Sequence, residues 1–393
     1  METAGTRSRD AASLAAQLGR MRFFAARENS SLQAALEPIE EALVVAEAGW
    51  MPDILSDAMN TKSLIFSSLG RPEEGLGLLE RALVVALEND ATWSAIRAFT
   101  NLSNEMWQRD RIADAHEYGE RGRALCERTG YRGAWWFLTG HEAGVLEWIG
   151  RWDDLETLWQ DFDERRDEPG AGSGDSIIDK AWISVLARGR GEADRASGLA
   201  ERYRPLEGSD DFQVRAFMEQ LFGMTAACEG RHDEALRRSM SVVEAHQVLG
   251  ARAWIFKEAM EDAFESALAL DDMEAARRIL TAVEAIPIGE RSPVVDAAAA
   301  GYGARIAAAG QGPPEAIDHG FRQAAHLTRE IGRPFALARF QLSHAEWLAD
   351  QGRSDEATEL AAAACEAFRA LRAGPWITRA EAIAGVGADP VLS

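Results

Sequence analysis

Reactive side chains are few in this chain and stand far apart. Its seven histidines are dispersed, and His319 and His326, which share a predicted helix, are separated by seven residues. That spacing is too long along a helix axis for both rings to bind one metal ion without further ligands. The sequence contains no HExxH motif and no Cys/His cluster. We therefore expect no metal site.

The three cysteines, Cys126, Cys228 and Cys365, are also widely separated, and none belongs to a CxxC motif. A chain without paired cysteines is typical of a reducing compartment, where thiols behave as small buried apolar groups. This pattern favours a cytoplasmic protein.

Acidic pairs occur at Asp153-Asp154, Asp210-Asp211 and Asp271-Asp272, but none has the third aspartate of a DDxxD metal site. Helix capping explains acidic residues at such turns. The glycine cluster GAGSGDS (170–176) has Asp175 where a phosphate-binding loop requires a cation. The sequence therefore predicts no catalytic residue and no cofactor.

Polar side chains that could bind rather than react recur on one kind of predicted helix. Arg97, Asn101, Asn104 and Gln108, at offsets of 4, 7 and 11, share one helical face. Amides and arginines along a groove can bind an extended peptide backbone, although an ordinary solvated face is the alternative. The predicted partner-binding residues are Asn60, Arg97, Asn101, Asn104, His141, Arg215, Glu219, Gln220, Lys257, Glu261, Arg339 and His344.

An internal repeat positions these residues. The string ALVVA occurs at 42–46 and again at 82–86, forty residues later. A second marker, an acidic or amide residue followed by a small or apolar one, recurs every 39 to 41 residues, with one imperfect member at Arg195-Ala196. Its other members are Gln33-Ala34, Glu74-Gly75, Asp114-Ala115, Asp154-Leu155, Glu234-Ala235, Glu274-Ala275, Glu315-Ala316 and Glu356-Ala357.

Each unit of this repeat is predicted to be a pair of helices. Leu76, Leu79, Leu83 and Ala86 form one stripe of a helix over about 72–87. Glycine in turns such as LGRPEE (69–74) ends the preceding helix, and the acids that follow favour the start of the next one. The small residue of the marker would let the paired helices approach closely.

The predicted fold is therefore all-α. It is a right-handed superhelical solenoid of about eight to nine helix-turn-helix repeats with a short C-terminal capping helix. We expect 1–29 to supply an N-terminal helix, 30–373 the repeat array with 168–176 as a candidate bend, and 374–393 the cap and tail. A distinct cap favours an open array over a closed ring.

The net charge limits the classes of partner that we expect this chain to bind. The chain carries 64 acidic and 42 basic residues, a formal charge of −22, which opposes nucleic acid and anionic lipid. It has no stretch of about 18 apolar residues and no secretory signal. Three lysines against 39 arginines suggest a GC-rich bacterial genome. We expect a cytoplasmic chain that binds a protein or peptide.

The repeats resemble tetratricopeptide repeats, whose usual period is 34. The longer period of forty is similar to the arrays of MalT-like and LuxR-type regulators and of ATPase-linked adenylate/guanylate cyclases. The phrases that carry this resemblance are LGRPEEGLGLLERAL (69–83), GRHDEAL (230–236), GRSDEATELAAAACEAF (352–368) and the tail ACEAFRALRAGPWITRAEA (364–382). The resemblance implies a signalling protein whose chemistry resides in other domains.

Three hypotheses follow. The first is a non-catalytic scaffold or sensor that binds a protein or peptide in its concave groove. The alternative is the detached C-terminal regulatory region of an ATPase-coupled nucleotidyl cyclase or LuxR-type regulator. The third and weakest is an all-α enzyme of closed toroid type. The sequence determines neither the ligand nor the oligomeric state.

Overall fold

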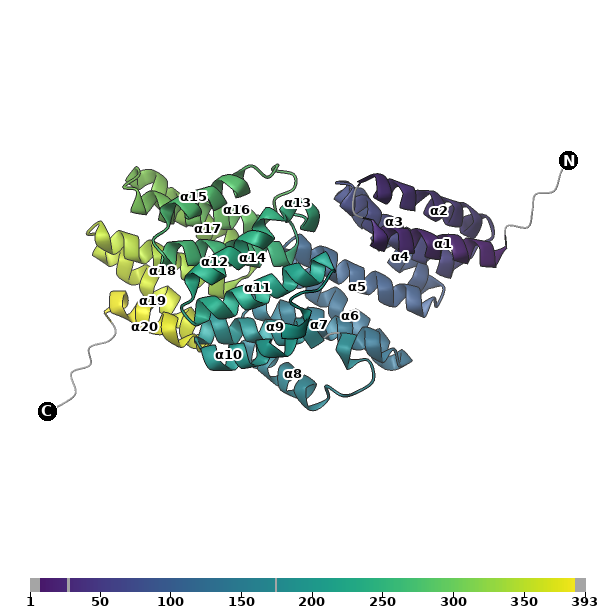
Figure 1. The fold of residues 1–393 in the computed structure, drawn as a ribbon, viewed down its shortest axis with the longest axis horizontal. Coiled ribbons are helices and arrows are strands. Elements are labelled where there is room, and N and C mark those ends of the chain that lie inside the picture. The colour runs from purple at the N-terminus through teal and green to yellow at the C-terminus, as the bar shows by residue number, and fades with distance from the viewer. Residues whose placement is uncertain (1–7, 27–28, 174, 386–393) are drawn as a thin grey trace. The chain divides into compact units, whose positions relative to one another are not determined.

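The computed structural model describes residues 8–26, 29–173 and 175–385. Every regular element in these residues is helical, which confirms the all-α prediction (Figure 1). The α-helices are α1 (Arg9–Ala25), α2 (Asn29–Ala48), α3 (Pro52–Ser68), α4 (Pro72–Glu88), α5 (Thr92–Gln108), α6 (Ile112–Thr129), α7 (Arg132–Trp148), α8 (Trp152–Glu164), α9 (Asp175–Ser184), α10 (Ala193–Ala200), α11 (Phe212–Cys228), α12 (His232–Glu244), α13 (His246–Leu249), α14 (Trp254–Ala269), α15 (Met273–Glu284), α16 (Pro293–Ala309), α17 (Pro314–Ile331), α18 (Pro334–Asp350), α19 (Ser354–Ala370) and α20 (Gly374–Ala384).

The turns inside the hairpins follow the predicted chemistry. Gly70 and Gly352 end their helices with φ of 77° and 74°, a backbone region that favours glycine. The arginine after each glycine pairs with the marker acid three residues on, as in Arg71–Glu74 and Arg353–Glu356. The marker acid therefore has a side-chain partner in addition to its place at the positive end of a helix.

The small residue of the marker allows close helix packing. A Cβ built on Gly75 would lie 2.6 Å from the Ser63 carbonyl oxygen of the preceding helix. The corresponding residues Ala115, Ala235 and Ala357 are buried. Close approach of paired helices, as predicted, is the reason that this column holds small residues.

The hairpin at the imperfect marker is irregular. After α9 the chain forms a π-helical turn, η2 (Val185–Arg190), and α10 is followed by a 3-10 turn, η3 (Glu201–Leu206). A shorter 3-10 turn, η1 (Ala171–Ser173), precedes α9. A π-helical turn inserts an extra residue into the helix, which changes the direction of the side chains that follow.

The chain divides into two compact units. Unit 1 comprises 1–107, 113–142 and 169–174, and unit 2 comprises 108–112, 143–168 and 175–393. In unit 1, α1 to α3 enclose a core that includes Ile39, Val45 and Ile65. The core of unit 2 centres on α14 to α16, with Phe264 and Tyr302 stacked at 4.4 Å between ring centroids. The domain boundaries proposed above remain predictions.

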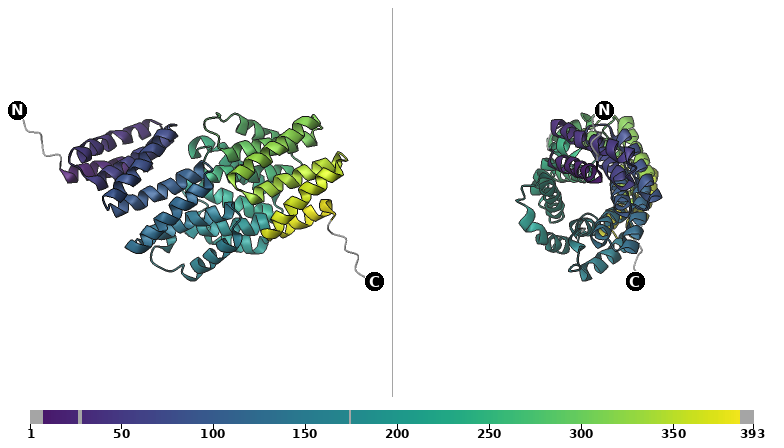
Figure 2. Two further views of the ribbon diagram at one scale, coloured as in Figure 1. Left: turned by 180° about the vertical axis from the view of Figure 1, so that it is seen from behind. Right: turned by 90° about the vertical axis from the view of Figure 1, so that its right-hand side faces the viewer.

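Unit 2 turns back on itself. The Trp376 indole of α20 donates to the Arg188 carbonyl, 188 residues away, at 2.8 Å, and Arg372 pairs with Asp153 at 2.7 Å. The start of α20 thus lies against η2, as the yellow and teal helices show in Figure 2. Between four and five repeats of unit 2 therefore bring α20 back into contact with η2.

None of the described helices combines the length and apolar character needed to span a membrane.

Candidate functional site

The first helices of successive hairpins in unit 2 face one another, and their inward side chains are charged. Six cations and six carboxylates meet there, which we call the charge network. Its members are Lys180, Arg188, Lys257, Arg305, Arg333, Arg339, Asp110, Glu147, Glu258, Glu261, Asp262 and Glu265.

Glu258 of α14 is the centre of the charge network. Lys180 donates to its carboxylate at 2.6 Å and Arg188 at 2.9 Å. The Trp148 indole and the Gln220 amide also donate to it, at 3.2 Å and 3.0 Å. Burial raises the pKa of Glu258, but Lys180 and Arg188 outweigh burial and lower this pKa to about 2. The carboxylate is therefore fully ionised although it is buried.

The π-helical turn directs Arg188 into the charge network. Arg188 forms two hydrogen bonds to Asp262, at 2.9 Å and 2.5 Å, besides its contact with Glu258. Lys180 also pairs with Glu147 at 3.1 Å. Burial and the neighbouring Glu258 raise the pKa of Glu147, although Lys180 and Arg188 oppose them. A planar guanidinium can bridge two carboxylates in this way because its donors are fixed in a fork.

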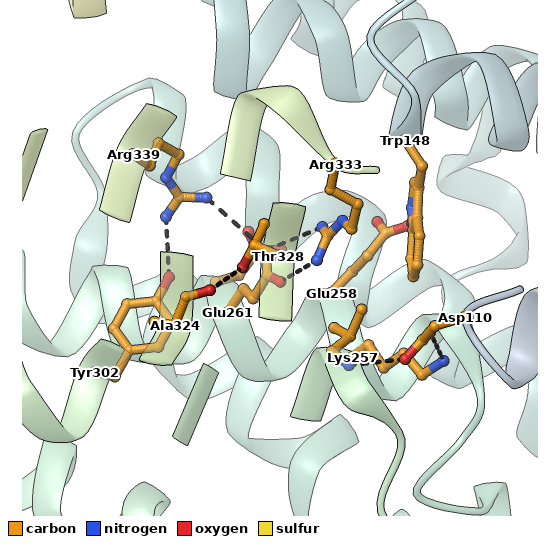
Figure 3. Close-up of polar contacts among 12 residues, drawn as sticks. Asp110, Trp148, Lys257, Glu258, Glu261, Tyr302, Ala324, Thr328, Arg333 and Arg339 are labelled. Atoms are coloured by element: carbon orange, nitrogen blue, oxygen red, sulfur yellow. Dashed lines mark hydrogen bonds and ion pairs between the residues drawn. The ribbon is translucent and has the colours of Figure 1, made fainter. Parts of the chain in front are cut away.

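Two further groups extend the charge network along α14 (Figure 3). Arg333 donates to Glu261 at 2.6 Å. Lys257 donates to Asp110 at 2.5 Å and to the Gln108 carbonyl at 2.9 Å. Asp110 in turn accepts the Val294 backbone N–H at 2.7 Å. Each buried charge therefore has an opposite charge within contact distance, as burial requires.

A third group lies at the far end of α14. Arg305 and the Tyr302 hydroxyl donate to Glu265 at 2.6 Å and 2.9 Å, and Arg339 also contacts this carboxylate. Arg339 donates to the Tyr302 oxygen at 3.0 Å (Figure 3).

Little space remains beside the charge network. A cavity of about 30 Å³ is lined by Arg188, Arg333, Arg339 and neighbouring side chains, and a second of about 10 Å³ by Tyr302 and Arg305. A space of this size holds no more than a few water molecules, since about 10–15 Å³ is enough for one. These spaces are too small for a peptide. The charges of this network pair with one another across the helices of unit 2.

Seven of the predicted binding residues lie in unit 2. Gln220, Lys257, Glu261 and Arg339 are part of, or bonded to, the charge network. The other three have local partners: Arg215 donates to the Ser209 and Asp210 carbonyls, Glu219 accepts from Arg238 at 3.3 Å, and His344 contacts Asp318 at 2.8 Å.

The other five predicted residues lie together in unit 1, on three successive first helices, α3, α5 and α7. We call Asn60, Arg97, Asn101, Asn104 and His141 the unit 1 face. The Asn101 amide donates to the Asn60 oxygen at 2.6 Å, across helices that are 41 residues apart in sequence. Arg97 pairs with Asp57 of α3, and burial lowers its pKa to about 10.

Aromatic side chains lie on or next to α5 and α7, the helices that carry most of the unit 1 face. His141 packs against Trp107 and Phe137, with ring centroids at 6.2 Å and 4.8 Å. Its burial lowers the pKa to about 4, so the ring is neutral at pH 7. Phe137 itself is exposed, as are Trp93 and Tyr131, whose rings lie 5.6 Å apart. Asn104 is half-buried. The unit 1 face thus combines an amide that can still reach a partner with aromatic rings open to solvent.

Sequence reasoning missed the residues at the centre of the charge network. Glu147, Lys180, Arg188, Glu258 and Asp262 were not among the predicted residues. A signal was present, because the charged pair Asp179-Lys180 stands in the mostly apolar run IIDKAWISVLA (177–187). A charge inside such a run indicates a buried charge that requires a partner.

Comparison with known proteins adds little. No family model matches the chain, and no curated protein does. Three solved structures align with 95%, 96% and 95% of the chain at 12%, 14% and 14% identity, with TM-scores of 0.36, 0.22 and 0.23. They are the APC/C hetero-tetramer Cut9–Hcn1, the TPR domain of P58(IPK) and a circular tandem repeat protein with novel repeat topology and enhanced subunit contact surfaces, of which 82%, 99% and 94% are covered. The assignment as an array of helical hairpins rests on the helices of this chain itself.

Proposed function

We propose that the chain is a non-catalytic scaffold that binds a protein or peptide through the unit 1 face. The observation that carries the proposal is the contrast between the two sets of first helices. In unit 2 the inward charges pair with one another. Unit 1 also has the Arg97–Asp57 and Asn101–Asn60 pairs, but it presents in addition the half-buried Asn104 amide and exposed aromatic rings on or next to the same helices.

The chemistry of the unit 1 face suits an extended peptide. The Asn104 amide can both donate to and accept from a peptide backbone, which every sequence provides. Phe137, Trp93 and Tyr131 offer rigid rings, the side chains that most often anchor a partner. Because the underlying helices are already packed, binding requires little ordering.

We further propose a bacterial, cytoplasmic signalling role. Support comes from the repeat phrases that resemble the arrays of MalT-like and LuxR-type regulators and from three unpaired cysteines. The same face would serve if the chain were the regulatory region of an ATPase-coupled cyclase or LuxR-type regulator.

A photo-crosslinking amino acid tests the location of the face. Placed at Asn104, it should capture a partner in cells that the same group at Val248, an exposed position of unit 2, does not capture. The captured protein is then purified and titrated against the wild type, Asn104→Arg and a control variant, Gln323→Ala, at an exposed amide on α17. We expect Asn104→Arg to weaken binding at least tenfold and Gln323→Ala to leave it unchanged. Equal affinities for all three would remove the unit 1 face from consideration.

A further inference from the structure

The larger cavity beside the charge network is lined by segments that lie far apart in the sequence. Glu147 of α7, Arg188 of η2 and Glu261 of α14 line it. Arg333, which precedes α18, and Arg339, in the second turn of that helix, line it as well, and they lie on either side of Glu261 (Figure 3). Three guanidinium groups and two carboxylates thus surround about 30 Å³, so the lining carries one positive charge in excess.

Arg339 has N–H groups that lack an acceptor. An arginine has five N–H donors, and both hydrogen bonds of Arg339, to Glu265 and to the Tyr302 oxygen, come from Nη2. Its Nη1 lies 3.8 Å from a Glu261 oxygen, which is too far for a hydrogen bond. Its Nε is buried and has no partner among the described residues. The side chain is only 11% exposed, so these donors need an acceptor inside unit 2.

The start of α18 adds backbone donors to the same place. Pro334 occupies the first helical position and has no N–H, and no side chain caps this end of the helix. The N–H groups of Phe335 and Ala336 find no acceptor in the part of the chain that the structure describes. Both residues line the cavity. The positive end of a 17-residue helix therefore adds to the charge of the three arginines.

The two carboxylates of the lining already accept hydrogen bonds with all their oxygens. In Glu147, one oxygen accepts from Ser184 and the other from Lys180. In Glu261, both oxygens accept from Arg333, at 2.6 Å and 3.3 Å. A water molecule would bring two further donors into this place, whereas an anion only accepts. The surplus of N–H donors thus favours an anion.

We propose that this cavity binds a small monovalent anion of the size of chloride or formate. We call it the anion site, formed by Arg188, Arg333, Phe335, Ala336 and Arg339. The single excess positive charge suits one negative charge, and a space for no more than a few water molecules excludes the dianion of phosphate. Because Arg188 belongs to η2 and Arg339 to α18, a bound anion would attract both and stabilise the contact between these segments of unit 2.

Thermal unfolding of the full chain tests the anion site. Sodium chloride is exchanged for sodium gluconate, whose anion is too large for the cavity, at constant ionic strength, so that charge screening does not change. The Tm of the wild type should rise by about 3–6 °C when chloride is in tenfold excess over its dissociation constant. Arg339→Gln should lose this dependence. The control Arg322→Gln, which changes an exposed arginine of α17, should keep it.

Chlorine NMR measures the binding itself and does not depend on stability. The folded wild type should broaden the chloride signal, and Arg339→Gln, shown to be folded by circular dichroism, should broaden it much less. Formate and bicarbonate are then added as competitors, and the anion that narrows the signal at the lowest concentration is the preferred ligand. If neither competes, chloride itself is the ligand.

The inference is overturned if the wild type has the same Tm in chloride and gluconate and leaves the chloride signal narrow, since water alone then occupies the cavity. An equal rise of Tm in the wild type and in folded Arg339→Gln also overturns it, because the stabilisation would then arise elsewhere. Neither result bears on the unit 1 face, which is tested by partner binding at Asn104.

Discussion

The first helices of the hairpins in unit 1 and unit 2 come from the same forty-residue repeat. Their polar side chains differ in charge and in how completely they are paired. In unit 2, Lys180 and Glu258 are almost completely buried and lie 2.6 Å apart. In unit 1 the equivalent layer contains amides besides the Arg97–Asp57 ion pair, and Asn101 bonds to Asn60 across neighbouring helices. Charges that face one another must pair completely once they leave water, whereas amides can be partly satisfied and still available.

The comparison indicates that the charge network lies where the helices of unit 2 come back into contact. Arg188 of η2 reaches both Glu258 and Asp262 of α14, and its carbonyl accepts from Trp376 of α20. Removing a charge there should therefore be far more costly than removing a polar group from the unit 1 face.

The largest expected effect tests this claim directly. Lys180→Met leaves Glu147 and Glu258 buried with one cation fewer, so the free energy of unfolding should fall by about 3–5 kcal/mol. Asn101→Ala in unit 1 is the matched change and should cost less, about 1–3 kcal/mol, because it leaves the buried but uncharged Asn60 oxygen without its donor. Urea unfolding followed by tryptophan fluorescence measures both. Similar losses for the two variants would contradict the contrast between the units.

Lowering the pH should destabilise unit 1 and unit 2 in different pH ranges. The pKa of His141 is about 4 in the folded chain because the ring is buried, below its ordinary value of 6.5. The stabilisation from its neutral form is complete above pH 6.5 and is lost as the pH falls through 4, which corresponds to roughly 3 kcal/mol. The pKa of Glu258 is about 2, so its contribution is lost only as the pH falls from 4.5 through 2.

Hydrogen exchange measured by peptide between pH 7 and pH 4.5 checks this order. Protection should fall first in α5 and α7, and His141→Phe should remove this loss. The pKa of His344 in unit 2 is also lowered by burial, but Asp318 opposes the shift. A loss of protection in α14 before α7 would argue against the prediction.

Substitution of two glycines in α4 should change the stability by a smaller amount. Gly75→Ala places a methyl group 2.6 Å from the Ser63 carbonyl oxygen and should cost about 1–3 kcal/mol. Gly77→Ala has nothing within 4 Å and should stabilise the helix by up to about 1 kcal/mol. Thermal melting separates the two. If both variants melted at the same temperature, close helix approach would not explain the small residue of the marker.

The smallest expected change in stability comes from removing an exposed ion pair in a turn. Arg151 pairs with Asp154 at 2.7 Å, and both side chains are more than half exposed. Arg151→Ala should change the free energy of unfolding by at most about 0.5 kcal/mol, because exposed ion pairs contribute little. A loss comparable to that of Lys180→Met would show that these turns, rather than the charge network, hold unit 2 together.

The fold could be predicted because its signals lie within one repeat. The stripe Leu76, Leu79, Leu83 and the turn glycine Gly70 act over a few residues, and the structure places a hairpin there. The candidate site was less predictable. The seven residues named in unit 2 lie on helices, as expected, yet sequence periodicity does not show which polar face meets another charged face and which meets solvent.

The sequence by itself determined the forty-residue unit, the helical pairs and the small residues where they touch, since propensity, turn chemistry and periodicity are local properties. The tertiary structure decided which polar helix faces pair with one another. Lys257 finds Asp110 across 147 residues and Lys180 finds Glu258 across 78. Such pairings depend on the small rotation from each hairpin to the next, added over several repeats, and no single repeat encodes that sum.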